Sequence, residues 1–199
     1  HLQRRRKQHT VSRPGAGIPG PFKMGGLDGY PFTGLTGMSA FASHVPDEGA
    51  VYIYYGPHIG ISKSGTVGEI QRYGQSKHTD CCGATKGALR KLLNNEIIPG
   101  TINDMDYQMN TIEQILFEQK ERITESKIPL LEATEVIYES IDQRIEELVS
   151  RTDYHSKYVI LQGGILINSD IDMGSFTALK RFDVINLQTK ERKSWLNLR

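Results

Sequence analysis

Residues 50–58 have the sequence Ala-Val-Tyr-Ile-Tyr-Tyr-Gly-Pro-His, and this stretch decides the fold class. Its first part is rich in β-branched and aromatic residues and has the length of a strand, which predicts a buried strand. Gly56-Pro57 ends that strand, because a proline cannot donate a backbone hydrogen bond to a ladder. The stretch therefore predicts a strand with His58 just past its carboxyl end.

Further strands and helices are predicted downstream of this stretch. Two more apolar runs indicate strands: residues 157–167, where Gly163-Gly164 marks a close backbone approach, and residues 181–186. Helical features, in particular apolar residues spaced three or four apart, are found in residues 83–96, 105–116 and 137–148. Strands separated by helices indicate an α/β fold, with a central, mostly parallel sheet flanked by helices.

The composition excludes several classes of protein. The chain has 199 residues, with 24 Lys+Arg, 23 Asp+Glu and a net charge of +1, so we expect no nucleic acid among its partners. Two adjacent cysteines cannot build a disulfide framework, so we expect an intracellular reducing compartment, either the cytoplasm or an organelle such as the chloroplast or mitochondrion. No apolar run approaches the roughly 20 residues that span a bilayer, and we expect no membrane span.

The two halves of the chain differ in composition. Residues 1–100 hold 17 of the 20 glycines and seven of the eight prolines, and their charge balance is +6 against −5 for the remaining residues. Loops on a rigid scaffold usually carry functional sites, so the first half is the expected location of the site.

The first 21 residues form a basic, Pro/Gly-rich arm, and residues 22–199 are expected to form a single α/β domain. The arm contains Arg4, Arg5, Arg6 and Lys7 without interleaved aromatic residues. Two interpretations stay open: an arm that binds nucleic acid or an anionic membrane, and a mobile arm or linker that lies on a partner subunit. The arm is also compatible with the remnant of an organelle transit peptide.

His58 and the pair Cys81-Cys82 are the strongest candidates for chemistry. A strand end in an open α/β sheet is where ligands bind, and a helix is expected to start near Cys82. A thiolate at a helix start is stabilised by backbone N–H groups, and imidazole and thiolate are ligands that zinc prefers. The alternative is structural: buried cysteines also serve as small apolar residues.

Several motifs, in order along the chain, resemble the limiting-CO2-inducible protein B family. They are Phe-x-Met-Gly-Gly-Leu-x-Gly-x-Pro-Phe-x-Gly-x-Thr-Gly at residues 22–37, Tyr-Gly-Pro-His-Ile-Gly-Ile at residues 55–61, Cys-Gly-Ala at residues 82–84 and Gly-Gly-Ile-x-Ile-Asn at residues 163–168. Members of that family are similar to β-carbonic anhydrases and form the theta class of carbonic anhydrases. The resemblance implies a β-carbonic-anhydrase-like α/β fold, a homodimer or larger assembly, and a zinc ion held by two cysteines and one histidine.

Matched to the family motifs, His58 corresponds to the histidine ligand and Cys82 to the second cysteine. The family's first cysteine and catalytic aspartate lie upstream of Phe22, where this sequence has no Cys, Asp or Glu. Either the chain is truncated there or this member has lost the ligand, and Cys81 or Asp80 are the candidates to replace it. Arg72 is the candidate catalytic basic group, and His44 is a second candidate catalytic residue near the pocket.

The resemblance implies zinc-dependent reversible hydration of CO2 to bicarbonate. A small dry pocket would favour CO2, and the apolar side chains of Phe32, Phe41, Ile59 and Ile61 are expected to line it. The alternative is a catalytically degenerate family member, a pseudoenzyme that acts as a structural or scaffolding subunit of an assembly. The absence of the first cysteine motif favours this alternative, and the intact motifs around His58 and Cys82 favour the enzyme.

Overall fold

The computed structural model describes residues 22–196, so the predicted arm at residues 1–21 lies outside the described residues. The helices are η1 (Leu27–Gly29), α1 (Gly34–Ala42), α2 (Gly83–Leu93), α3 (Tyr107–Glu118), α4 (Lys120–Glu125) and α5 (Pro129–Arg151). The strands are β1 (Ala50–Tyr55), β2 (His58–Gly60), β3 (Glu69–Ile70), β4 (Thr79–Asp80), β5 (Tyr158–Asn168), β6 (Ser175–Asn186) and β7 (Arg192–Ser194).

The central sheet confirms the α/β class and combines parallel and antiparallel pairing. Strands β1 and β2 both pair with β5 in parallel, and the strand order is β1-β5-β6-β7. Strand β6 pairs with β5 in antiparallel orientation, and β7 pairs with β6 in the same way. The parallel pairing that we expected is therefore limited to the pairs of β1 and β2 with β5. The reason is connection length: a parallel neighbour needs a long crossover, which the helices supply before β5, whereas the short loop after Asn168 returns the chain directly as a hairpin.

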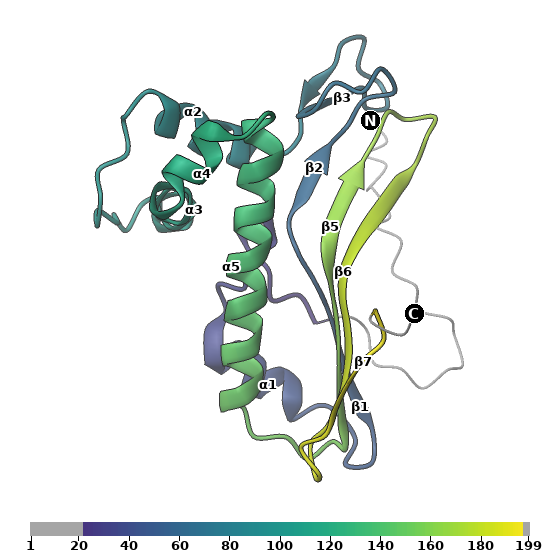
Figure 1. Cartoon of the computed structure of the whole chain (residues 1–199). Helices are drawn as coiled ribbons and strands as arrows, with labels where there is room; N and C mark the ends of the chain where they lie inside the picture. Colours follow the sequence, from purple (N-terminus) through teal and green to yellow (C-terminus); the bar gives the residue numbers. More distant parts are fainter. Residues whose placement is uncertain (1–21, 197–199) are drawn as a thin grey trace, which may run out of the picture.

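The long helix α5 covers one face of the sheet (Figure 1). Side chains alternate along β1, so that Val51, Ile53 and Tyr55 are buried while Tyr52 and Tyr54 face the opposite side. The buried face packs against residues of α5 that recur at helical spacing, among them Ile137, Ile141 and Ile145. Within residues 22–196, no helix combines the length and apolar character needed to cross a membrane.

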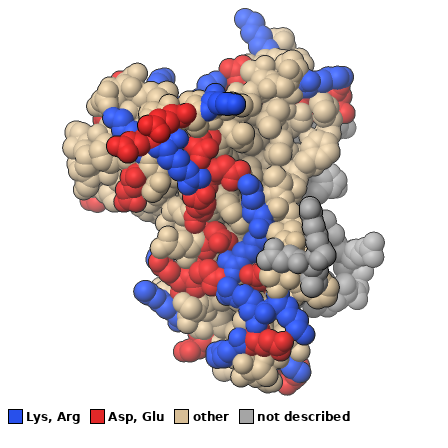
Figure 2. All heavy atoms as spheres, in the orientation of Figure 1, with Lys and Arg blue, Asp and Glu red and all other residues tan. Residues whose placement is uncertain are grey.

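Charged side chains gather along α5 and its border with the sheet (Figure 2). At this border Arg181 of β6 pairs with Asp142 at 3.1 Å, with Asp183 at 2.7 Å and with Glu146. The Tyr55 hydroxyl of β1 donates to the same Asp142 carboxylate. A largely buried guanidinium surrounded by three carboxylates fixes α5 against the sheet, because breaking such a group leaves a buried charge unpaired.

Two glycines bring the loop before α1 against the end of β1. Gly29 has a φ of 78°, and a Cβ atom on it would lie 2.4 Å from the Gly56 carbonyl oxygen. Gly56 in turn has a φ of 143°, and a Cβ atom there would lie 1.7 Å from the Gly164 carbonyl oxygen. Neither position accepts a side chain, so this close stacking of backbone requires glycine. It places η1 directly beside the start of β2.

Candidate metal centre

Asp28, His58 and Cys82 form a cluster beside the carboxyl end of β1. Each residue offers one potential ligand atom, and these atoms all lie within 4.8 Å of one another. Asp28 and Cys82 are buried, and the imidazole of His58 is partly exposed. The residues come from η1, the first position of β2 and the position before α2, so the fold brings together three segments that are distant in sequence.

Backbone contacts fix the position of each member. Asp28 has a φ of 52°, a left-handed conformation that aspartate tolerates, and the preceding Leu27 N–H donates to Gln108 Oε1 of α3 at 2.9 Å. His58 pairs with Leu166 in the parallel ladder between β2 and β5. The carbonyl oxygen of Cys81 accepts a hydrogen bond from the Gly60 N–H at 2.7 Å, which holds the start of α2 beside β2.

The Asp28 carboxylate has one oxygen with a hydrogen-bond partner and one without. Its Oδ2 accepts a hydrogen bond from the Thr85 hydroxyl of α2. Its Oδ1 lies 3.5 Å from His58 Nδ1 and is buried with no hydrogen-bond partner among the described residues. A buried carboxylate oxygen without a donor is unfavourable, so this atom is the expected contact of a bound cation.

The pKa values of all three side chains in the cluster are raised above their ordinary values. Burial raises the pKa of the Asp28 carboxyl, while Thr85 and the nearby His58 oppose the rise. Burial also raises the pKa of the Cys82 thiol, and the charge of Asp28 adds to it. Interaction with the Cys81 thiol raises the pKa of His58 against the opposing effect of burial, and Asp28 contributes in the same direction. A metal ion that binds the deprotonated side chains would compete with protons for them, so its affinity would rise with pH.

The donor set fits zinc. Carboxylate oxygen, imidazole nitrogen and thiolate sulfur are the three ligand types that zinc takes in proteins. The three potential ligand atoms lie within 4.8 Å of one another, close enough for one ion to contact all of them. Three protein ligands leave one position open, as in catalytic rather than structural zinc sites.

Cys81 and Asp80, the predicted replacement ligands, lie outside this cluster. The Cys81 thiol accepts a hydrogen bond from the Asn168 amide at 3.5 Å and lies near His58. The Asp80 carboxylate forms an ion pair with Lys86 at 2.6 Å. The structure thus brings together His58 and Cys82, as predicted, and adds Asp28 as the third candidate donor.

A cavity of about 370 Å³ opens beside His58. It is lined by His58, Ile70, Gln71, Arg72, Tyr73, Cys81, Asn168, Ser169, Ile171 and Ser175. Most of these side chains are polar, whereas we expected a small apolar pocket. Phe32, predicted to line that pocket, instead packs edge-on against Tyr107 at 5.5 Å between ring centroids, and Ile59 is part of the buried core.

Arg72, the candidate basic group, lies in the wall of this cavity. Its guanidinium donates to the Thr79 hydroxyl and, at 2.8 Å, to the Asp80 carbonyl oxygen. These contacts hold the cation in the loop between β3 and β4, close enough for its charge to oppose protonation of His58. Arg72 is thus positioned to attract an anion into the cavity.

The structure does not bring His44 to the cluster. The residue follows α1, where its Nδ1 lies 2.6 Å from the Ala40 carbonyl oxygen. This contact satisfies a carbonyl at the end of the helix, which is a frequent structural role of histidine. The side chain is exposed, and its position does not support the catalytic role that we expected for His44.

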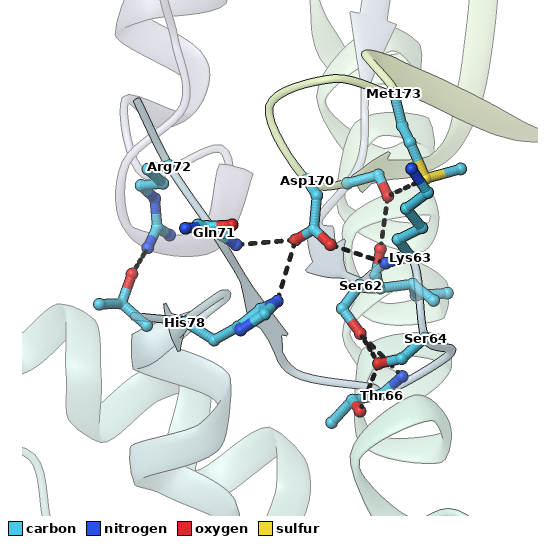
Figure 3. A network of polar contacts seen from close by, with 12 residues as sticks. Ser62, Lys63, Ser64, Thr66, Gln71, Arg72, His78, Asp170 and Met173 are labelled. Carbon is cyan, nitrogen blue, oxygen red and sulfur yellow. Dashed lines mark hydrogen bonds and ion pairs between the residues drawn. The ribbon is translucent and has the colours of Figure 1, made fainter. Parts of the chain in front are cut away.

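A second buried aspartate, Asp170, organises the loops around the cavity (Figure 3). Its two carboxylate oxygens accept hydrogen bonds from the Lys63 and Gln71 backbone N–H groups, each at 2.8 Å. His78 Nε2 approaches the same carboxylate at 3.3 Å. These contacts join the loops after β2, β3 and β5, and the two N–H donors lower the pKa of Asp170.

Sequence reasoning missed Asp28 and Thr85. Asp28 occupies a position that the motif at residues 22–37 leaves unspecified, and no spacing rule connects it to His58. The only indication in the sequence was the flanking Gly29, since glycine permits a close backbone approach, which the structure shows at this position. Thr85 follows Cys82-Gly83-Ala84 in sequence, but only the fold shows that its hydroxyl contacts Asp28.

The chain is similar to proteins of known family and structure. It matches the model of a family described as limiting CO2-inducible proteins B/C β-carbonic anhydrases over residues 16–186. PtLCIB4, a homolog of the limiting CO2-inducible protein LCIB, is 26% identical with a TM-score of 0.77, covering 87% of this chain and 73% of that chain. LCIB itself is 19% identical with a TM-score of 0.63, covering 86% and 70%, and shares the fold. No match was found among curated proteins.

Proposed function

Because the chain belongs to the family of limiting CO2-inducible proteins B/C β-carbonic anhydrases, we propose that it catalyses zinc-dependent, reversible hydration of CO2 to bicarbonate. The family agrees with the resemblance found in the sequence motifs. The observation that carries the proposal is the buried Asp28 Oδ1 beside His58 and Cys82, an oxygen that has no hydrogen-bond partner among the described residues. In this proposal these three residues hold the zinc ion.

In this proposal some residues of the site bind the metal ion, and others line the route by which substrate and product reach it. A zinc ion at the cluster would supply a Lewis acid that lowers the pKa of water to about 7. Asp28, His58 and Cys82 provide the ligand atoms and keep one position open. The polar cavity admits water and bicarbonate to His58, and the Arg72 guanidinium offers a positive charge to the anionic product.

Paired variants test the proposal. Zinc content and CO2 hydration are measured for the wild-type protein and for His58→Ala and Cys82→Ser, with His44→Ala and Cys81→Ser as matched controls outside the cluster. We expect about one zinc ion per wild-type chain and loss of both zinc and activity in the two cluster variants. The controls should keep their zinc. Zinc that is lost equally in the Cys81→Ser and Cys82→Ser variants would contradict the ligand assignment.

The scaffold hypothesis is the second candidate, and one observation bears on the assembly that it requires. Tyr52 and Tyr54 on the face of the sheet opposite α5 are 51% and 48% exposed, and a face of this kind is suited to contact with another chain. A homodimer that uses this face would dissociate in the double variant Tyr52→Ser/Tyr54→Ser, measured by sedimentation. A wild-type protein that assembles but neither binds zinc nor hydrates CO2 would favour the scaffold over the enzyme.

A further inference from the structure

Thr85 contacts two of the three candidate ligands. It is the third residue of α2, and its side chain is almost fully buried at 1% exposure. Its hydroxyl donates to Asp28 Oδ2. Its backbone N–H and hydroxyl also lie beside the Cys82 sulfur. A single side chain therefore links the carboxylate from η1 to the thiol that precedes α2.

The direction of this hydrogen bond determines which carboxylate oxygen remains available. A hydroxyl has one proton to donate, and Thr85 donates it to Oδ2. Oδ1 is left without a hydrogen-bond donor and faces His58 Nδ1 at 3.5 Å. The Thr85 contact thus fixes both the rotation of the Asp28 carboxylate and the identity of its free oxygen.

The local structure restricts Thr85 to this role. A threonine inside a helix usually returns its hydroxyl to a carbonyl one turn earlier, as Thr134 of α5 does to Leu130 at 2.9 Å. Thr85 lies in the first turn of α2, where its hydroxyl instead reaches across to η1. A β-branched side chain has few rotamers, so the hydroxyl is held rigidly in this direction.

We propose that Thr85 is a positioning residue that makes Asp28 a one-oxygen zinc ligand through Oδ1. The inference rests on the proposed function, because it concerns the ligand set of that site. Outer hydrogen bonds of this kind typically change metal affinity by about 10–100-fold. Without the hydroxyl, Oδ2 would lose its hydrogen-bond donor, and the contact that sets the rotation of the Asp28 carboxylate would be absent.

The test compares variants that remove or keep the hydroxyl. Zinc affinity is measured by competition with a chromogenic chelator, and the ligand geometry by the absorption spectrum of the cobalt-substituted protein. We expect Thr85→Val and Thr85→Ala to lose about 10–100-fold in affinity and to change the cobalt spectrum. Thr85→Ser should retain wild-type affinity and spectrum. Thr134→Val controls for the loss of a buried threonine hydroxyl elsewhere and should retain both.

A double-mutant cycle identifies the route of the effect. If Thr85 acts through Asp28, Thr85→Val should weaken zinc binding in the wild type and have little further effect in the Asp28→Asn background. Equal zinc affinity in wild-type and Thr85→Val or Thr85→Ala protein, with circular dichroism showing a retained fold, would overturn the inference alone. A wild-type protein without zinc affinity would overturn the proposed function and the inference with it. Thr85→Ala supplies the comparison if Thr85→Val fails to fold.

Discussion

Asp28 and Asp170 are both buried aspartates next to a histidine, yet their surroundings are opposite. Both are less than one tenth exposed, and their carboxylates lie 3.5 and 3.3 Å from His58 and His78 respectively. Asp170 accepts hydrogen bonds from two backbone N–H groups, whereas Asp28 accepts one from a hydroxyl, and its other oxygen has no hydrogen-bond partner among the described residues. The pKa of Asp170 is lowered and that of Asp28 is raised.

The difference separates a structural carboxylate from a ligand. The negative charge of Asp170 is satisfied by the chain itself, so this residue stabilises the loops that it joins. Asp28 is buried at a position where the protein supplies too few donors, and a cation would complete its surroundings. Burial beside a histidine therefore does not identify a metal ligand; an unsatisfied oxygen beside further donor atoms does.

The largest expected effect is on zinc affinity. Asp28→Asn keeps the shape of the side chain but removes the charge, and we expect zinc binding to weaken by more than about 100-fold, beyond what loss of an outer hydrogen bond causes. Asp170→Asn should change zinc affinity by less than about tenfold, because its carboxylate is already saturated. Chelator competition at constant pH measures both. Equal losses in the two variants would remove the distinction drawn between the two aspartates.

The second effect concerns the stability of the metal-free protein. Here the substitution of Asp170 should have the larger effect and that of Asp28 the smaller. Asp170→Asn should lower the midpoint of thermal unfolding clearly, since hydrogen bonds from the Lys63 and Gln71 N–H groups to a charged acceptor are weakened. Asp28→Asn should leave the midpoint unchanged or raise it, because it removes a buried negative charge whose Oδ1 has no hydrogen-bond partner among the described residues. Thermal unfolding in the presence of a chelator measures both midpoints. A lower midpoint for Asp28→Asn than for Asp170→Asn would contradict the comparison.

The third effect is the pH dependence of that stability. The lowered pKa of Asp170 means that its contribution is present above the pKa of an unfolded aspartate, about 3.9, and is lost as the pH falls through the folded value. The deficit of Asp170→Asn relative to wild type should therefore shrink as the pH falls below about 4. The pH dependence contributed by Asp28 has the opposite sign. Because its pKa is raised in the folded state, protonation of Asp28 stabilises the fold at low pH, and this stabilisation is lost as the pH rises. Urea unfolding of metal-free protein across this pH range measures both slopes.

The sequence predicts the scaffold of the site better than its ligand set. The strand before His58 and the helix start after Cys82 follow from local patterns, and the structure places these two residues together. Asp28 could not be found this way, because its contact with His58 depends on the packing of Gly29 against Gly56, which joins segments without a common periodicity. His44 illustrates the converse, since proximity in sequence to a glycine-rich loop does not give proximity to the site.

The topology of the sheet could likewise be predicted only in part from the sequence. Apolar runs predicted strands in the regions of β1, β5 and β6, but strand direction depends on the connection and not on the run itself. The six-residue loop after β5 contains Asp170, whose carboxylate accepts hydrogen bonds from Lys63 and Gln71, residues that are distant in sequence. Local sequence patterns could therefore predict neither the hairpin of β5 and β6 nor these hydrogen bonds.

The smallest effect is expected at His78, and it tests how much the histidine beside each aspartate contributes. The His78 side chain is 44% exposed, so its interaction with Asp170 is screened by solvent, and the two backbone donors remain when the ring is removed. His78→Gln should lower the unfolding midpoint by less than Asp170→Asn does and should leave zinc affinity unchanged. His58→Gln, the matched substitution beside Asp28, should abolish zinc binding because His58 is itself a proposed ligand. A loss of zinc in His78→Gln would show that the loops around the cavity act on the metal centre, and the two aspartates would then belong to one coupled site.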